Sequence, residues 1–85
     1  MSIIEHIIKK ILELSATECT IKKCKGYVSV RIDGKETMTI PLCRYPYLVE
    51  DIKKITKNGI IEVYCGEPYN LAVKEEDSCL LLRRS

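Results

Sequence analysis

The chain has 85 residues, of which 46% are hydrophobic and 31% are charged, and its formal net charge is +2 at pH 7. This length accommodates one domain with a thin core, and the apolar content excludes a disordered chain. A dedicated DNA-coating protein is usually more basic than this, so net charge alone does not decide nucleic-acid binding. No apolar run approaches the roughly 18 residues of a membrane span.

Amino-acid usage indicates the compartment and the origin of the protein. Ile is abundant, Trp and Phe are absent, and Lys, Glu and Arg dominate the charged residues. This composition is typical of heat-adapted organisms, archaea among them, or of AT-rich genomes. The first segment carries Glu5 and the pair Lys9-Lys10 in mid-stretch, a pattern that excludes a signal peptide. We therefore expect a cytoplasmic protein without a membrane partner.

The cysteines are numerous for a chain of this length. They are Cys19, Cys24, Cys43, Cys65 and Cys79. No two of them have Cys-x-x-Cys spacing and the sole histidine is His6, so the sequence predicts no metal site and no cofactor. Two alternatives remain for the thiols. They act as small buried hydrophobic groups in a mesophile, or two of them form an internal disulfide in a hyperthermophile.

A helix is predicted over residues 3–14, because large aliphatic side chains recur at helical spacing. These are Ile3, Ile4, Ile7, Ile8, Ile11 and Leu12. Ser2 is placed to cap the helix, and Glu5 three residues later completes a capping box. The stripe is broad for so small a partner sheet, so this helix either packs on the core alone or also forms a dimer contact.

Two strands follow the first helix. A two-residue loop at Lys25-Gly26 pairs Ile21 with Val30 and Cys19 with Ile32, so that both apolar sets share one face. The next turn contains Asp33-Gly34, and an odd-length loop there is needed to place Val28 and Val30 on the face of Met38 and Ile40. We therefore predict a three-residue loop with a bulge, in which Gly34 or Lys35 is left-handed. Register explains this turn, so no catalytic role is assigned to Asp33.

A second helix is predicted from about residue 46 to residue 57, after the connection "PLCRYPY" (41–47). Its inward side chains are expected to be Leu48, Val49, Ile52 and Ile55. Asn58-Gly59 is expected to close the helix in a left-handed C-cap. Tyr45 and Tyr47 flank Pro46, and they either pack the start of the helix or form part of a protein interface.

The remaining chain is predicted to form three strands, over 60–65, 71–74 and 79–83. A four-residue loop, "EEDS", pairs Val73 with Leu80 and Leu71 with Leu82. The element order is then α-β-β-β-α-β-β-β. The sequence predicts a single small α+β domain over residues 1–85, with a mainly antiparallel sheet packed by two helices.

Residues that carry chemistry are sparse. There is no glycine-rich phosphate loop, the neighbouring carboxylates are consecutive, and His6 lies on the polar side of a terminal helix, so we predict no enzyme activity. Basic side chains cluster near the first strands and the C-terminus. They give either a solvated sheet face or a nucleic-acid contact. The candidate nucleic-acid residues are Lys22, Lys23, Arg31, Arg83 and Arg84.

Two short stretches resemble the N-terminal domain of the type II secretion and type IV pilus ATPases, a PAS-like α/β unit. In that family a helix is followed by Ala-Ser-Asp-Ile-His-Ile and then by Arg-Ile-Asp-Gly. Residues 16–21 (Ala-Thr-Glu-Cys-Thr-Ile) and 31–34 (Arg-Ile-Asp-Gly) match this pattern. Cys19 and Thr20 depart from it, and the 85 residues contain no ATPase core. The resemblance implies a fold and an interaction role, not ATP hydrolysis.

The leading hypothesis is a non-enzymatic protein-interaction or regulatory module that forms a homodimer and binds an unknown protein partner. Its candidate interface residues are Ile4, Ile8, Ile11, Tyr45 and Tyr47. The alternative is a small nucleic-acid-binding protein that uses the basic outer sheet face and the C-terminal arginine pair.

Overall fold

In residues 2–64, 66 and 68–84, which the computed structural model describes, two helices and six strands alternate in the predicted order α-β-β-β-α-β-β-β. The α+β fold class is therefore confirmed. The elements are α1 (Ile3–Glu13), β1 (Glu18–Lys23), β2 (Tyr27–Ile32), β3 (Lys35–Pro41), a short 3-10 helix η1 (Leu42–Arg44), α2 (Tyr45–Ile55), β4 (Ile60–Tyr64), β5 (Pro68–Glu75) and β6 (Cys79–Arg84).

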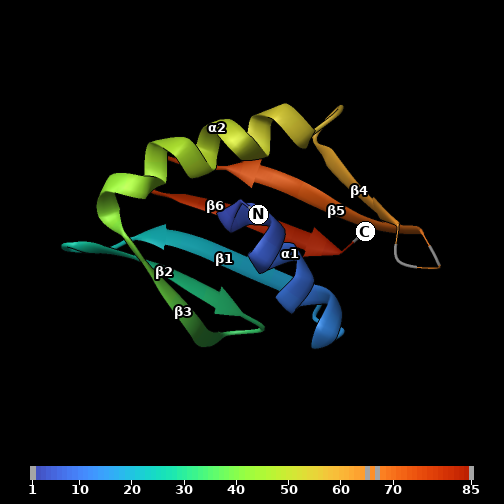
Figure 1. The fold of residues 1–85 in the computed structure, drawn as a ribbon, viewed down its shortest axis with the longest axis horizontal. Helices are drawn as coiled ribbons and strands as arrows, with labels where there is room; N and C mark the ends of the chain where they lie inside the picture. The colour runs from blue at the N-terminus through green and yellow to red at the C-terminus, as the bar shows by residue number, and fades with distance from the viewer. Residues whose placement is uncertain (1, 65, 67, 85) are drawn as a thin grey trace.

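The strands form one antiparallel sheet in the order β3-β2-β1-β6-β5-β4, so β1 and β6 lie at its centre. Figure 1 shows α1 crossing the middle of this sheet. The buried side chains of both helices share one core with the apolar face of the sheet. Within the described residues no helix lies on the opposite face, so this part of the chain forms two layers.

The first helix begins and ends close to the predicted bounds. The Ser2 hydroxyl oxygen accepts a hydrogen bond from the backbone N–H of Glu5 at 3.4 Å, as expected for an N-cap. Ile4, Ile7 and Ile11 are the buried members of its aliphatic stripe. They pack against the sheet and fix which side of α1 faces the core.

Side-chain alternation sorts the strands into one apolar and one polar face, as predicted. Val28 lies opposite Ile40 and Val30 lies opposite Met38, all on the helix side. The buried strand residues of this face are Cys19, Ile21, Val28, Val30, Ile32, Ile40, Ile61, Tyr69, Leu71, Leu80 and Leu82. Burial raises the pKa of the Cys19 thiol to about 12, with a smaller contribution from Asp33, so this thiol stays protonated and inert.

The turn between β2 and β3 differs from the prediction. Ile32 pairs with Lys35, so Asp33-Gly34 is a two-residue turn in which both residues are left-handed, with φ of 51° and 81°. Thr37 is the extra residue that keeps Met38 and Ile40 on the same face as Val28 and Val30. It bulges from β3 where the register shifts. The predicted three-residue loop is therefore wrong. A turn with two positive φ angles matches the strand twist, so the bulge sits inside the strand instead.

The hairpin between β5 and β6 also differs from the prediction. Val73 pairs with Leu82, not Leu80, and the Glu76 N–H donates to the Cys79 carbonyl at 2.9 Å. The turn therefore has two residues in place of the four predicted. A register shift of two leaves every side chain on the same face, so the apolar pattern alone does not distinguish the two pairings.

The second helix ends two residues earlier than predicted, at Ile55. Asn58 and Gly59 have φ of 53° and 77°, but they form a tight turn that joins Lys57 to Ile60, not a helix cap. The side chain of Ile55 is 41% exposed, so the prediction that it faces inward is wrong. This exposure matters for the site described below.

Neither described helix is long and apolar enough to cross a bilayer. Cys19, Cys24, Cys43 and Cys79 are free thiols, so the disulfide alternative is not seen among these four. Cys65 lies outside the described residues.

Candidate interaction site

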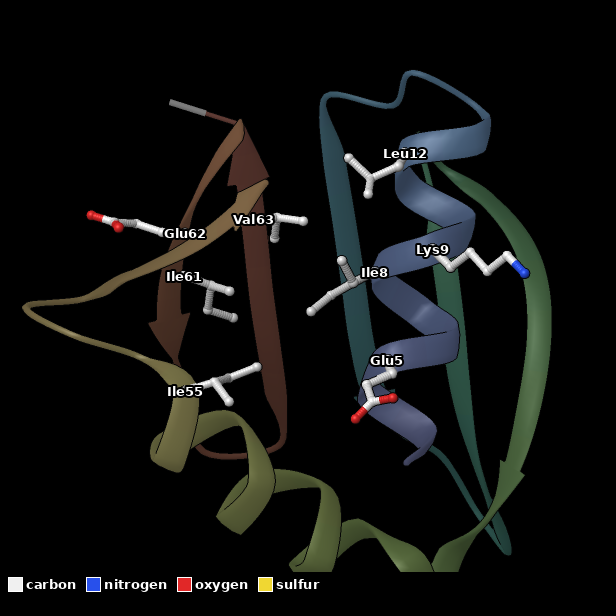
Figure 2. Close-up of a pocket in the computed structure, with 8 residues that line it drawn as sticks. All are labelled: Glu5, Ile8, Lys9, Leu12, Ile55, Ile61, Glu62 and Val63. Carbon is white, nitrogen blue, oxygen red and sulfur yellow. The ribbon is translucent and has the colours of Figure 1, made fainter. Parts of the chain in front are cut away.

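An apolar groove of about 390 Å³ opens between α1 and the edge strand β4. Its apolar lining is Ile8, Leu12, Ile55, Ile61 and Val63. Figure 2 shows these five side chains pointing into the gap from three elements: α1, the end of α2, and β4. Such a concave apolar lining is typical of a surface that binds another molecule.

The groove exists because two helices do not cover six strands. Five strand spacings of about 4.8 Å make the sheet about 24 Å wide, whereas a helix with its side chains is about 10 Å across. Because α1 crosses the centre of the sheet and β4 lies at its edge, the two elements stand apart (Figure 1). Ile61 is still buried, but Val63, Ile8 and Leu12 are only half-buried beside the groove.

The α1 side of the groove is a single helical stripe. Glu5, Ile8, Lys9 and Leu12 follow the spacing i, i+3, i+4, i+7, so they share one side of the helix. Ile8 and Leu12 point toward β4, while Lys9 extends away from it (Figure 2). Both Glu5 and Lys9 are exposed. Within the described part of the chain neither side chain forms an ion pair.

The predicted interface residues divide between three environments. Ile4, Ile11 and Tyr45 are buried in the core of the chain itself and offer little area to a partner. Ile8 is half-buried and lines the groove. Tyr47 is 64% exposed and lies on α2, outside the groove lining.

Most of the groove was not found from the sequence. Leu12 and Ile61 belong to predicted elements, but no local pattern shows that they meet. Their proximity depends on β4 being the last strand of the sheet, which is set by the long-range pairing of β1 with β6.

Three further large apolar side chains are exposed outside the groove lining. Tyr27 pairs with Pro41 across β2 and β3, and Leu42 follows directly in the chain. Tyr27, Leu42 and Tyr47 are among the most exposed large apolar side chains of the protein. Tyr is favoured at protein interfaces, so each exposed tyrosine is a candidate contact for a protein partner.

Three of the predicted nucleic-acid residues, Lys22, Arg31 and Arg83, lie on the open face of the sheet. Arg83 is paired with Glu18 at 2.9 Å, and Arg31 lies directly opposite Glu36. Positive and negative groups therefore alternate across this face. A nucleic-acid surface needs concentrated positive charge, which this arrangement does not supply.

The other two predicted nucleic-acid residues face the helix side of the sheet. The Lys23 ammonium lies over the ring of Tyr45, 5.1 Å from its centre. The Arg84 guanidinium lies over the ring of Tyr69 at 4.5 Å. Both cations are used in contacts with aromatic rings of the core, and the five basic residues do not form one surface.

Asp33 has a structural role. Its Oδ1 atom accepts hydrogen bonds from the Thr17 N–H at 3.1 Å, the Thr17 hydroxyl at 3.0 Å and the Glu18 N–H at 3.1 Å. The Thr17 backbone hydrogen bond, together with the other two, holds the pKa of Asp33 below its ordinary value of 3.8. The turn between β2 and β3 is thereby fastened to the start of β1.

We expect Asp33→Asn to lower the melting temperature by a few degrees near neutral pH, because Asn tolerates the left-handed backbone but loses the charge. A lowered pKa in the folded state stabilises the protein above the unfolded pKa, and this contribution is lost as pH falls through the folded pKa. The difference between the two proteins should therefore shrink below about pH 4. Thermal melts across pH measure it, and a constant difference would show that the carboxylate charge plays no part.

No group of three or more His, Cys, Asp or Glu side chains suited to a metal occurs among the described residues. The groove is lined by five aliphatic residues and by the charged residues Glu5, Lys9 and Glu62. No protein family model matches the chain, and no curated protein sequence is significantly similar to it. The groove geometry therefore carries the functional argument.

Proposed function

We propose that this chain is a non-enzymatic protein-interaction module that works as a homodimer. The observation that carries the proposal is the apolar groove between α1 and β4, with Ile55 exposed at its end. Covering these side chains removes apolar surface from water, which is the main driving force for association. Most of the groove lining is aliphatic, which favours binding over catalysis.

The exposed side chains of Tyr27, Leu42 and Tyr47 offer contacts for a further protein. None of these three residues lines the groove, so dimer formation through the groove leaves them accessible. Exposed apolar side chains outside the dimer groove suit an adaptor or regulatory role. The resemblance of residues 16–21 and 31–34 to the N-terminal domain of secretion ATPases agrees with such a role.

Sedimentation equilibrium tests the homodimer. As concentration rises, we expect the average mass to approach twice the 9.8 kDa of one chain, with a dissociation constant in the range of about 1 to 100 µM. Apolar association should persist when salt is raised from about 0.1 to 0.5 M, although ion pairs are screened there. A mass that stays at 9.8 kDa up to about 1 mM would contradict the proposal.

A nucleic-acid test separates the alternative function. Because Arg83 is neutralised by Glu18 and Arg31 faces Glu36, we expect RNA and DNA to be retained weakly and only at low salt. Tight retention at about 0.15 M salt, with a steep salt dependence, would favour the nucleic-acid function instead.

A further inference from the structure

We propose that a second copy of this chain fills the groove, with α1 lying antiparallel to α1 of the partner subunit across a two-fold axis. The proposal rests on the homodimer proposed above and names its interface. In this arrangement Glu5 of each copy lies opposite Lys9 of the partner subunit. One contact then covers both grooves, as an isologous interface requires.

The charge pattern of α1 selects the orientation. The stripe beside the groove reads Glu5, Ile8, Lys9 and Leu12, with one negative and one positive group a single turn apart. A parallel copy in register places Glu5 next to Glu5 and Lys9 next to Lys9. An antiparallel copy with its axis near Ile7 places opposite charges together twice, and it brings the two Ile8 side chains into contact.

The same pattern selects the occupant. The charged residues that line the groove are Glu5, Lys9 and Glu62, and the Glu62 carboxylate points away from the gap (Figure 2). The two charges on α1 are opposite in sign, so a copy of α1 complements both. Within the described residues neither Glu5 nor Lys9 has an ion-pair partner in its own chain. The next charges along the helix, Lys10 and Glu13, pair with each other at 4.0 Å. Those two residues do not line the groove.

The apolar part of the contact comes from the groove itself. Ile8 and Leu12 of each copy enter the space between α1 of the partner subunit and the partner's β4, where Ile61 and Val63 form the floor. Two helices pack about 8 to 10 Å apart, so the paired helices lie between the two sheets. The eleven residues of α1 span only about 16 Å, which makes the interface small and the dimer micromolar.

Charge reversal tests the pairing directly. Glu5→Lys and Lys9→Glu each place like charges together twice, so each variant alone should dimerise at least about tenfold more weakly than the native chain. An equimolar mixture of the two should form heterodimers of near-native affinity, because every facing pair is again opposite in sign. The double variant should also dimerise like the native chain. Sedimentation measures all four, and the recovery on mixing should fade in high salt.

Matched controls lie on the same helix. Lys10→Glu and Glu13→Lys make the same changes of charge outside the groove, and they should alter the dimer dissociation constant less than about threefold. All four positions are at the surface or partly exposed, so the variants are expected to fold, which thermal melts check. Weakening by the controls equal to that by the test variants would overturn the pairing of Glu5 with Lys9.

The remaining outcomes separate this inference from the function on which it rests. If the native chain dimerises but both test variants dimerise equally well and show no preference on mixing, the α1 pairing is wrong and the homodimer stands. The interface then lies elsewhere, and Tyr47→Asp would be tested next. If the native chain is monomeric throughout, both proposals are overturned.

Discussion

Replacing Ile7 by Ala is expected to lower the free energy of unfolding by about 2 to 5 kcal/mol. Ile7 lies at the centre of α1 and is 0% exposed, so the shortened side chain leaves a cavity that its neighbours fill only in part. A chain of 85 residues is typically stable by about 4 to 13 kcal/mol, so a large share of the total is lost.

Leu14→Ala is the matched control for this prediction. Leu14 lies just beyond the end of α1 and is 54% exposed, so its truncation should change the free energy of unfolding by less than about 0.5 kcal/mol. Urea denaturation of the three proteins measures both effects, and an unchanged m-value shows that the unfolded state is the same. Equal effects at positions 7 and 14 would mean that α1 does not pack on the sheet through its isoleucines.

Ile7 illustrates what the sequence shows reliably. The stripe of isoleucines on α1 and the alternation in β2 are local periodic patterns, and each fixes a buried face without reference to the rest of the chain. The existence and order of the helices and strands and the apolar face of the sheet were accordingly predicted correctly. One strand is longer than predicted, since β5 begins at Pro68 and not at Leu71. The first hairpin register was also predicted, since Ile21 pairs with Val30 and Cys19 with Ile32.

The loops were predicted less well, for a physical reason. Side-chain alternation requires an odd number of residues between Val30 and Met38 if both are to face the core. It does not determine whether the extra residue lies in the turn or in the strand. Turn energetics decide this, because Asp33-Gly34 already satisfies a tight two-residue turn and Thr37 is left to bulge. The β5–β6 hairpin is a similar case, in which two registers bury the same face.

The groove was missed because it arises from strand order. Placing β6 beside β1 sends β4 to the edge of the sheet, and only then does β4 border a groove beside α1, with Ile61 buried and Val63 half-buried. No pattern within β4 contains this information. The exposed Ile55 is likewise decided by where α2 stops, two residues before the predicted end.

Replacing Tyr69 by Phe is expected to lower the free energy of unfolding by about 1 to 3 kcal/mol. The Tyr69 hydroxyl donates a buried hydrogen bond to the Ala16 carbonyl, 53 residues earlier in the chain. Phe keeps the ring and its packing but leaves that carbonyl buried without this donor, so most of the loss is the desolvation penalty of the carbonyl.

Tyr47→Phe is the control, because Tyr47 is 64% exposed and removal of its hydroxyl leaves no buried group without a partner. We expect the free energy of unfolding to change by less than about 0.5 kcal/mol. Equal effects of the two substitutions would show that the Tyr69 hydroxyl does not hold the Ala16 loop. This loop joins α1 to β1 and is also held by the Arg84 N–H, which donates to the Thr17 carbonyl at 2.8 Å. The loop fixes the end of α1 that carries Leu12. Tyr69→Phe should therefore also speed amide hydrogen exchange in the last turn of α1. Such an effect would show that the stability of the core and the shape of the groove are coupled.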